Sequence, residues 1–169
     1  NVFLYYGEEL GMKGSGKDEN KRAPMYWNKD GNAEGMCKGP ADMDDFRMKF
    51  DSLEEQQEDP DSIYNYVKQV IRVRNQNPVI ARGTTAYLEQ YSGEQCFALT
   101  RSDENSSLLM LGNTSAETAT VDLSGLTIGK TAAEELVLLG ELYTGEETAE
   151  RTGAEITLPA WSILILGEE

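Results

Sequence analysis

The stretch AEITLPAWSILIL, residues 154–166, contains two short runs of apolar and β-branched side chains. Such runs predict strands, and we expect residues 160–166 to form a central, closing strand. Five more runs of the same kind precede them, at residues 85–91, 95–101, 107–112, 118–123 and 135–139. Turn-rich segments such as SGE, DENSS and SGLTIGK separate the runs. Seven short strands at this spacing indicate an antiparallel sandwich or barrel.

A sandwich over residues 84–169 also predicts which side chains lie in its core. The runs alternate or are continuously apolar, so their large aliphatic and aromatic members are expected to point inward. The side chains expected to be mostly buried are Phe97, Leu109, Leu111, Val121, Leu136, Leu138, Ile156, Ile163 and Ile165.

Upstream of the strands, residues 59–78, DPDSIYNYVKQVIRVRNQNP, predict one helix. Ser62 and the two aspartates before it are N-cap candidates. Apolar residues then recur at helical spacing and mark one face. This face holds Ile63, Val67, Val70, Ile71 and Arg74. Pro78 ends the helix, because the residue before a proline is driven out of the helical conformation.

The first residues, NVFLYYGEELGM, predict a strand at residues 2–6, stopped by Gly7. A continuous apolar run of this kind suits a strand buried on both faces of a parallel sheet. Its neighbours would be reached through crossovers of a dozen or more residues, which raises the question whether residue 1 is the start of the protein. Residues 11–60 are polar and without sustained periodicity, and a loop of that length is usually functional or disordered.

The chain carries 15 basic and 30 acidic residues over its 169 positions, a net charge of −15. This field repels nucleic acid and anionic membrane surfaces, so we expect neither as a partner. A solvated acidic surface explains the charge more simply than a neutral or cationic ligand does. No apolar stretch approaches the roughly 20 residues of a membrane span, no signal peptide is visible, and the sequence assigns no compartment.

The sequence contains no histidine, which excludes a Ser-His-Asp or Cys-His nucleophile system and any histidine metal site within this chain. The cysteines, Cys37 and Cys96, lie far apart in unlike contexts, the first in a Gly-rich stretch and the second in an apolar run. We expect two unpaired thiols rather than a disulfide.

The acidic clusters are weak candidates for catalysis or for metal binding. Glu8 and Glu9 are neighbours at a strand end and point to opposite faces, so structural roles are expected for them rather than catalysis. Residues 42–45, DMDD, begin like a calcium loop, but Phe46 stands where the third oxygen ligand belongs. The surroundings of Asp30 are better explained as a solvated loop than as Ca²⁺ ligands. The segment GMKGSG lacks the ending and the helix of a phosphate loop.

Arg22 and Trp27, in the segment KRAPMYW, are the more informative pair. An arginine with aromatic residues in a long loop after a parallel strand has the composition of a sugar-binding rim. Its aromatic faces can stack, and its forked donor can bind hydroxyls. The competing interpretation is an anchored loop with Trp27 packed inward.

Four blocks of sequence together resemble the C-terminal part of the α-amylase family of glycoside hydrolases, glycoside hydrolase family 13. They are YYGEELGM, KRAPMYW, FDSLEEQQEDPDSIYNYVKQVIRVRNQNP and a β module ending in LPAWSILIL, in the family's order and spacing. The resemblance implies that residues 1–80 are the end of a (β/α)₈ barrel, with strand 8 at residues 2–6 and helix 8 at residues 62–75. Residues 81–169 would be an all-β sandwich domain. The fold class expected is therefore mainly β, preceded by a barrel remnant.

The resemblance also implies a function. The family's three catalytic acids lie on earlier barrel strands, so this chain is expected to carry no catalytic residue and to be inactive alone. The longer protein would be a retaining hydrolase of α-glucans or maltooligosaccharides, of the α-amylase or oligo-α-glucosidase type. Arg22 and Trp27 would bind substrate, while Tyr6, Glu8 and Glu9 would have structural or second-shell roles. After Trp27 the sequence departs from the commonest family pattern, which leaves α-1,4 and α-1,6 linkages both open.

Two alternatives remain for the β domain. It is either a starch-binding module, with Tyr87, Tyr91 and Tyr143 as aromatic candidates, or a structural cap that stabilises the barrel. The partners expected are the rest of the barrel, or another copy of the chain, through residues 1–6. We expect no cofactor; Ca²⁺ is conceivable only in the longer protein.

Overall fold

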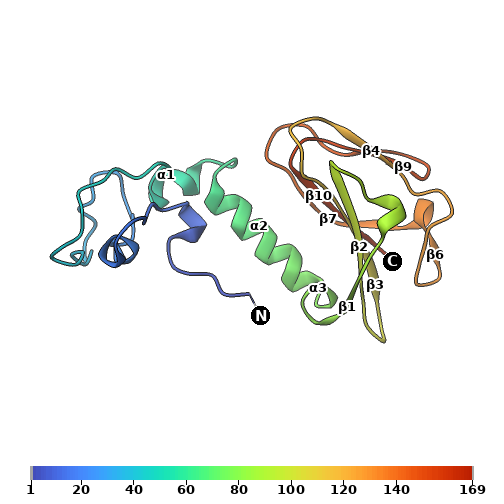
Figure 1. The fold of residues 1–169 in the computed structure, drawn as a ribbon, viewed down its shortest axis with the longest axis horizontal. Coiled ribbons are helices and arrows are strands. Elements are labelled where there is room, and N and C mark those ends of the chain that lie inside the picture. The colour runs from blue at the N-terminus through green and yellow to red at the C-terminus, as the bar shows by residue number, and fades with distance from the viewer. Residues whose placement is uncertain (1, 169) are drawn as a thin grey trace. The chain divides into compact units, whose positions relative to one another are not determined.

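The computed structural model describes residues 2–168, and the chain divides into two compact units. The first unit is Asn1–Lys68 and the second is Gln69–Glu169. The helix α2, Ile63–Gln76, contains the boundary between them (Figure 1). The fold class agrees with the expectation from the sequence, because the second unit is mainly antiparallel β and the first unit is largely irregular.

The first unit contains three short helical segments in a long irregular chain. They are the 3-10 helices η1, Glu8–Leu10, and η2, Asp18–Arg22, and the α-helix α1, Leu53–Glu58. Helix α1 was not predicted from the sequence, although its start has a local signal. The Ser52 side chain accepts a hydrogen bond from the Glu55 N–H, and the Glu55 carboxylate accepts one from the Ser52 N–H. This reciprocal capping box satisfies two backbone donors at the first turn.

The interior of the first unit is held by polar side chains. Gln56 is buried, and its amide nitrogen donates to the carbonyls of Leu10 and Asp51, at 3.0 and 2.7 Å. Its amide oxygen accepts the Tyr64 N–H at 3.1 Å. Asn20, also buried, bonds the Ser15 carbonyl and both the N–H and the carboxylate of Asp44. Because loop backbone cannot pair with itself, these side chains supply its hydrogen-bond partners.

The predicted strand at residues 2–6 does not form. No strand lies there, and Val2 and Phe3 are 85 and 88% exposed. The physical reason is that a strand is defined by hydrogen bonds to a neighbour, and no described segment pairs with these residues. The five apolar side chains therefore lie on the surface of the first unit.

The predicted helix at residues 62–75 is present as α2, displaced by one residue. Its expected apolar face is only half covered, and Ile71 is 45% exposed. Val73 is the one buried residue of α2, and it packs closely against Gly140 in β7. A Cβ atom added to Gly140 would lie only 2.7 Å from Cγ1 of Val73. Gln69 also donates to the Glu141 carbonyl at 2.8 Å, so the second half of α2 contacts strand β7. A short helix missed by the sequence analysis, α3, Val79–Arg82, follows.

The second unit is built on a five-stranded antiparallel sheet in the order β1-β2-β3-β10-β7. Its strands are β1 Thr84–Tyr87, β2 Cys96–Ser102, β3 Ser107–Asn113, β7 Val137–Leu142 and β10 Ser162–Gly167. The prediction that the last run forms a central strand is confirmed, since β10 pairs with β3 on one side and with β7 on the other.

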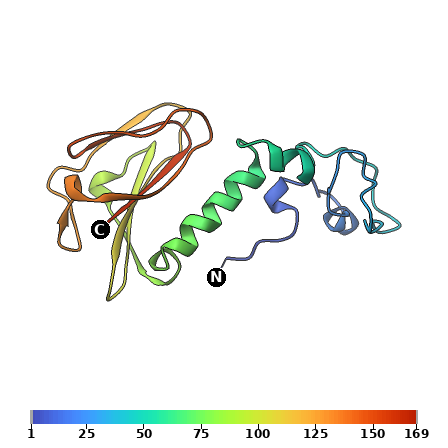
Figure 2. The same ribbon diagram turned by 180° about the vertical axis from the view of Figure 1, so that it is seen from behind.

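A second, three-stranded sheet in the order β4-β9-β8 faces the first (Figures 1 and 2). Its strands are β4 Ala119–Asp122, β8 Glu150–Thr152 and β9 Glu155–Leu158, and a small ribbon joins β5 Thr127–Ile128 to β6 Thr131–Ala132. The 3-10 helices η3, Glu89–Tyr91, and η4, Ala133–Glu135, lie in connections. β8, β5, β6 and both 3-10 helices were not predicted, because two- and three-residue elements carry no periodicity.

One apolar core lies between the two sheets. Leu109, Leu111, Leu164 and Leu166 from the first sheet meet Val121, Ile156 and Leu158 from the second. Of the side chains predicted to be buried, most are buried, and Phe97 and Ile163 are half-buried. Leu138 is 54% exposed, so that prediction was wrong. Leu136 caps the end of η4 and lies outside β7, so the period-two count from Leu136 to Leu138 does not apply.

Candidate functional site

Two hollows of the first unit adjoin at Tyr6, Arg22 and Ala23. The Tyr5 hollow, about 470 Å³, is also lined by Tyr5, Glu8, Met12, Lys13 and Asp18. The Trp27 hollow, about 490 Å³, is also lined by Glu9, Pro24, Met25, Trp27, Gly35 and Cys37. The structure thus brings together all five site residues that the sequence singled out: Tyr6, Glu8, Glu9, Arg22 and Trp27.

Tyr6 connects the turn before η1 to the end of η2. Its hydroxyl donates to the Ala23 carbonyl at 3.0 Å, and its ring lies against that of Tyr5, with centroids 4.6 Å apart. Partial burial, and after it the neighbouring Tyr5, raise the pKa of Tyr6 above its ordinary value. The raised pKa favours the neutral hydroxyl, which donates the hydrogen bond to Ala23 in the wall shared by the two hollows.

Arg22 is the last residue of η2 and is half exposed. Its Nη2 lies 3.1 Å from Asp18 Oδ2 and 3.8 Å from Glu19 Oε1, one helical turn earlier. Exposed ion pairs of this kind contribute little to stability, but they restrict where the guanidinium points. Because Asp18 and Glu19 leave part of its five-donor fork free, Arg22 can still donate hydrogen bonds to a ligand.

Trp27 is 45% exposed, and its loop is anchored through the backbone. The carbonyls of Tyr26 and Trp27 accept the N–H groups of Leu53 and Glu54, at 2.9 and 3.0 Å. These donors are among the N–H groups that the first turn of α1 cannot satisfy itself. The loop is anchored as the competing interpretation required, but the indole is not packed inward.

Glu8 and Glu9 both accept hydrogen bonds from backbone groups of the preceding turn. Glu8 Oε2 accepts the Tyr5 N–H at 3.2 Å, and Glu9 Oε2 accepts the Gly7 N–H at 2.8 Å. Gly7 takes a φ of 87°, a conformation that side chains with a Cβ rarely adopt. The two carboxylates thus support this sharp turn, and each belongs to a different hollow.

The described residues offer no gathered metal ligands. Within residues 2–168 no group of three or more His, Cys, Asp or Glu side chains is placed to hold an ion. Asp44 instead pairs with Lys17 at 2.8 Å, and this contact, followed by the hydrogen bond from Asn20, lowers the pKa of Asp44. Cys37 and Cys96 are both free, and none of the helices in residues 2–168 has the length and apolarity to cross a membrane.

Several residues of the two hollows were missed from the sequence, among them Met25 and Cys37. Met25 lies inside the quoted segment KRAPMYW, between Arg22 and Trp27, whereas Cys37 has no pattern that would have identified it and comes to the site through loop folding. The buried Asn20 and Gln56, which hold that loop, also lack a signal. The capping box at Ser52 and Glu55 has the sequence pattern S-x-x-E, which would have indicated the start of α1.

The three aromatic candidates of the second unit have different surroundings. Tyr87 is 61% exposed, and Tyr91 is half-buried. The Tyr143 hydroxyl donates to Glu141 Oε2 at 2.7 Å and accepts the Ala149 N–H at 3.0 Å. Burial, opposed in part by the Ala149 bond, raises the pKa of Tyr143 to about 12. Tyr143 is a structural residue in this geometry, which leaves Tyr87 and Tyr91 as surface aromatics.

Comparison with known proteins identifies relatives for both units. Residues 1–83 match the family model of the α-amylase catalytic domain. Alpha-amylase 3 of Dictyoglomus thermophilum is 32% identical over 81 residues, which are 48% of this chain and 16% of that protein. The structure of Eubacterium rectale Amy13B superposes with a TM-score of 0.91 at 38% identity, over all of this chain and 32% of the other.

The α-amylase from H. orenii superposes with a TM-score of 0.76 at 27% identity, over 99% of this chain and 32% of the other. The chain thus spans about a sixth of the length of the D. thermophilum protein and about a third of the length of these two structures. The family model matches residues 1–83 only, whereas the two structures superpose over both units. The chain is similar to the C-terminal part of enzymes of the α-amylase family, glycoside hydrolase family 13.

Proposed function

We propose that the chain is the C-terminal part of a retaining glycoside hydrolase that acts on α-glucans or maltooligosaccharides, and that Arg22 and Trp27 contact the substrate. The observation that carries this proposal is the shared rim of the two hollows. Arg22 lines both, and the half-exposed Trp27 lines one of them. A forked donor beside an exposed aromatic face is a suitable arrangement for a sugar ring and its hydroxyls.

In this proposal Tyr6, Glu8 and Glu9 have structural roles. Their hydrogen bonds to Ala23, Tyr5 and Gly7 shape the wall against which the substrate would lie. None of the three supplies acid–base chemistry. Hydrolysis of a glycosidic bond needs one carboxyl group on each side of the bond, about 5–5.5 Å apart in a retaining enzyme. The carboxylates of Glu8 and Glu9 instead both accept hydrogen bonds from backbone N–H groups of the same turn.

The chain alone is therefore proposed to be inactive. Residues 1–80 would complete a barrel whose other strands carry the catalytic acids, and residues 81–169 would form the domain that stabilises this barrel. The exposed side chains at residues 2–6 support a partner at this position, because five consecutive apolar side chains in water are unfavourable. The partner we propose is the remainder of the barrel.

The decisive experiment supplies that remainder. The 169-residue chain is co-expressed with the separate upstream segment of its own longer protein, and the purified complex is assayed on maltodextrin and on an α-glucoside. We expect turnover from the complex and none from either part. A chain that hydrolyses maltodextrin alone after rigorous purification would contradict the proposal, as would a complex that forms but leaves both α-linked substrates intact.

A further inference from the structure

Two more hollows adjoin in the second unit, along the 3-10 helix η3. The Cys96 hollow, about 510 Å³, lies between residues 90–96 and strand β4. The Tyr87 hollow, about 660 Å³, lies between residues 87–91 and residues 125–127. Both are lined by Gln90 and Tyr91, and we call the pair the η3 groove. Each volume lies within the range of about 300–1,000 Å³ that is common for small-molecule sites.

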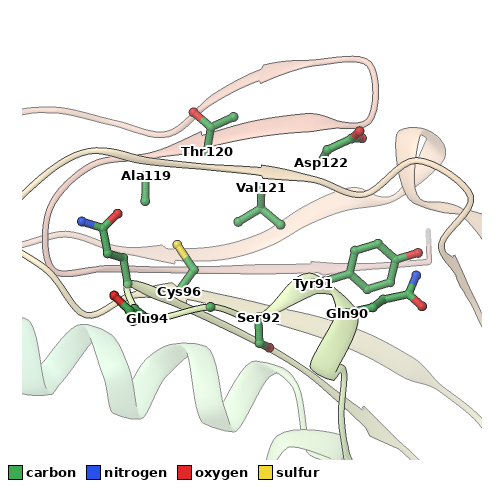
Figure 3. A pocket seen from close by; sticks show the side chains of 11 residues that line it. Gln90, Tyr91, Ser92, Glu94, Cys96, Ala119, Thr120, Val121 and Asp122 are labelled. Atoms are coloured by element: carbon green, nitrogen blue, oxygen red, sulfur yellow. The ribbon is translucent and has the colours of Figure 1, made fainter.

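The groove has an apolar floor and a polar rim. In Figure 3, Ala119 and Val121 point from β4 toward the segment that carries Cys96 and Tyr91, whereas Thr120 and Asp122 point to the other side of the strand. The alternation follows from the pleat of β4, whose burial also alternates. Gln90 and Glu94 are exposed and provide the polar groups of the rim.

Tyr87 adds an accessible aromatic face at one end of the groove. It is the last residue of β1, an edge strand of the five-stranded sheet, and it is 61% exposed. Tyr91, whose ring packs partly on the core, lies in the wall common to both hollows. A ligand along the groove would meet one tyrosine face in the Tyr87 hollow and a second between the hollows.

The charges of the lining restrict the ligand class. Neither hollow is lined by a lysine or an arginine, and Glu89, Glu94 and Asp122 are all among the lining residues. An anionic ligand such as a phosphate would be repelled at this surface. Amide and carboxylate groups beside tyrosine rings instead suit a neutral ligand with many hydroxyls and apolar ring faces, which is a carbohydrate.

We propose that the η3 groove is a non-catalytic binding site for a short segment of α-linked glucan. Tyr87 stacks on one sugar ring, and Gln90 and Glu94 bond hydroxyls of the neighbouring units. The choice of α-glucan among carbohydrates rests on the proposed function of the longer enzyme. Every residue of the groove lies in the second unit, so binding here does not require Arg22, Trp27 or the rest of a barrel.

The test titrates the full 169-residue chain with maltoheptaose in a calorimeter, with cellopentaose as the β-linked comparison. We expect saturable millimolar binding of maltoheptaose and at least severalfold weaker binding of cellopentaose. Tyr87→Ala should weaken maltoheptaose binding by about two- to tenfold, the range for one lost aromatic contact. Tyr87→Phe keeps the ring and should bind like the wild type. Gln90→Ala is a second exposed variant whose folding is not at risk.

Leu138→Ala is the matched control, since Leu138 is exposed on β7, at the edge of the sheet opposite to β1. Trp27→Ala reports on the first unit. The proposal is overturned if no saturable binding is found, if cellopentaose binds equally well, or if Tyr87→Ala and Gln90→Ala bind like the wild type. Loss of binding in Trp27→Ala alone would also overturn it. Because binding is measured without turnover, this result is independent of the co-expression assay.

Discussion

The two units of the chain differ most in what fills their interiors. In the second unit the two sheets enclose a continuous aliphatic core, from Leu109 and Leu111 on one side to Ile156 and Leu158 on the other. Among the buried apolar side chains of residues 2–168, only Leu10 and Ala23 belong to the first unit. Its other buried side chains are polar, and they bond to loop backbone.

This difference indicates which of the two units is the more stable. Each buried leucine or isoleucine contributes about 1.5–3 kcal/mol, so the second unit has a driving force of its own for folding. Hydrogen bonds contribute about 0.5–1.5 kcal/mol each, and the first unit must order a long loop with few apolar contacts. We infer that the second unit is the more stable. The two tryptophans can report this, because Trp27 lies in one unit and Trp161 in the other.

The largest effect is expected from a core truncation in the second unit. Leu111→Ala removes a fully buried side chain of β3 and should lower the free energy of unfolding of that unit by about 2–5 kcal/mol. Urea unfolding followed by Trp161 fluorescence, in a Trp27→Phe background, measures it. Leu138→Ala, an exposed site, should change the midpoint little. Equal losses in the two variants would show that the proposed core does not carry the stability.

The next effect tests the polar interior of the first unit. Gln56→Ala leaves the carbonyls of Leu10 and Asp51 and the Tyr64 N–H without their partner, at a cost of about 2–3 kcal/mol. In urea, the Trp27 signal of Gln56→Ala, measured in a Trp161→Phe background, should be lost at a lower concentration than the Trp161 signal, measured in a Trp27→Phe background. Gln57→Ala, the exposed neighbour, should behave like the wild type. Simultaneous loss of both tryptophan signals in Gln56→Ala would contradict the separation of the two units.

The third prediction concerns the site on the first unit, in the longer enzyme. Arg22→Ala should lower kcat/KM on short α-glucans by about ten- to hundredfold, because a charged hydrogen bond to substrate is worth about 1.5–3 kcal/mol. Folding should change little, since the ion pairs of Arg22 are exposed. Arg47→Ala, an exposed arginine outside both hollows, is the control. Wild-type kinetics in Arg22→Ala would reduce Arg22 to a loop anchor.

The smallest effect is a pH dependence confined to the second unit. The pKa of Tyr143 is raised from 10.0 to about 12, so its protonated form is favoured in the folded state. Its contribution is therefore complete below pH 10 and is lost as the pH rises from 10 through about 12. Trp161-monitored unfolding should show a lower midpoint across this window. Tyr143→Phe should abolish the dependence attributable to this residue, and an unchanged slope in that variant would refute the assignment.

Much of the second unit was predictable because its signals are local. Apolar runs such as residues 107–112 and 161–166 need only period-two or continuous patterning to be recognised as strands. The helix was recognised by its spacing and by the proline after it, and the bounds that the resemblance implied, residues 62–75, differ from those of α2 by one residue. The failures share one cause. Leu138 and the two-residue strands depend on turns and register, which no pattern within a single run encodes.

The candidate site was predictable in its members but not in its geometry. Residue type and motif order singled out Arg22, Trp27, Tyr6, Glu8 and Glu9. Only the folded loop shows that Tyr6 bonds Ala23, that Glu8 and Glu9 hold the turn at Gly7, and that Met25 and Cys37 join the same hollow. A loop without periodicity is ordered by contacts between residues distant in sequence, such as Asn20 with Asp44.

The sequence by itself determined the family resemblance, the all-β character of the C-terminal half and the absence of any histidine chemistry. These properties depend on residue type and on spacing over a few positions. Tertiary structure alone decided that residues 2–6 are not a strand in this chain and that Tyr143 is structural while Tyr87 is exposed. It also decided that two hollows adjoin at η3. Whether a residue is exposed, or paired in a strand, depends on the residues that contact it, and those residues lie elsewhere along the chain.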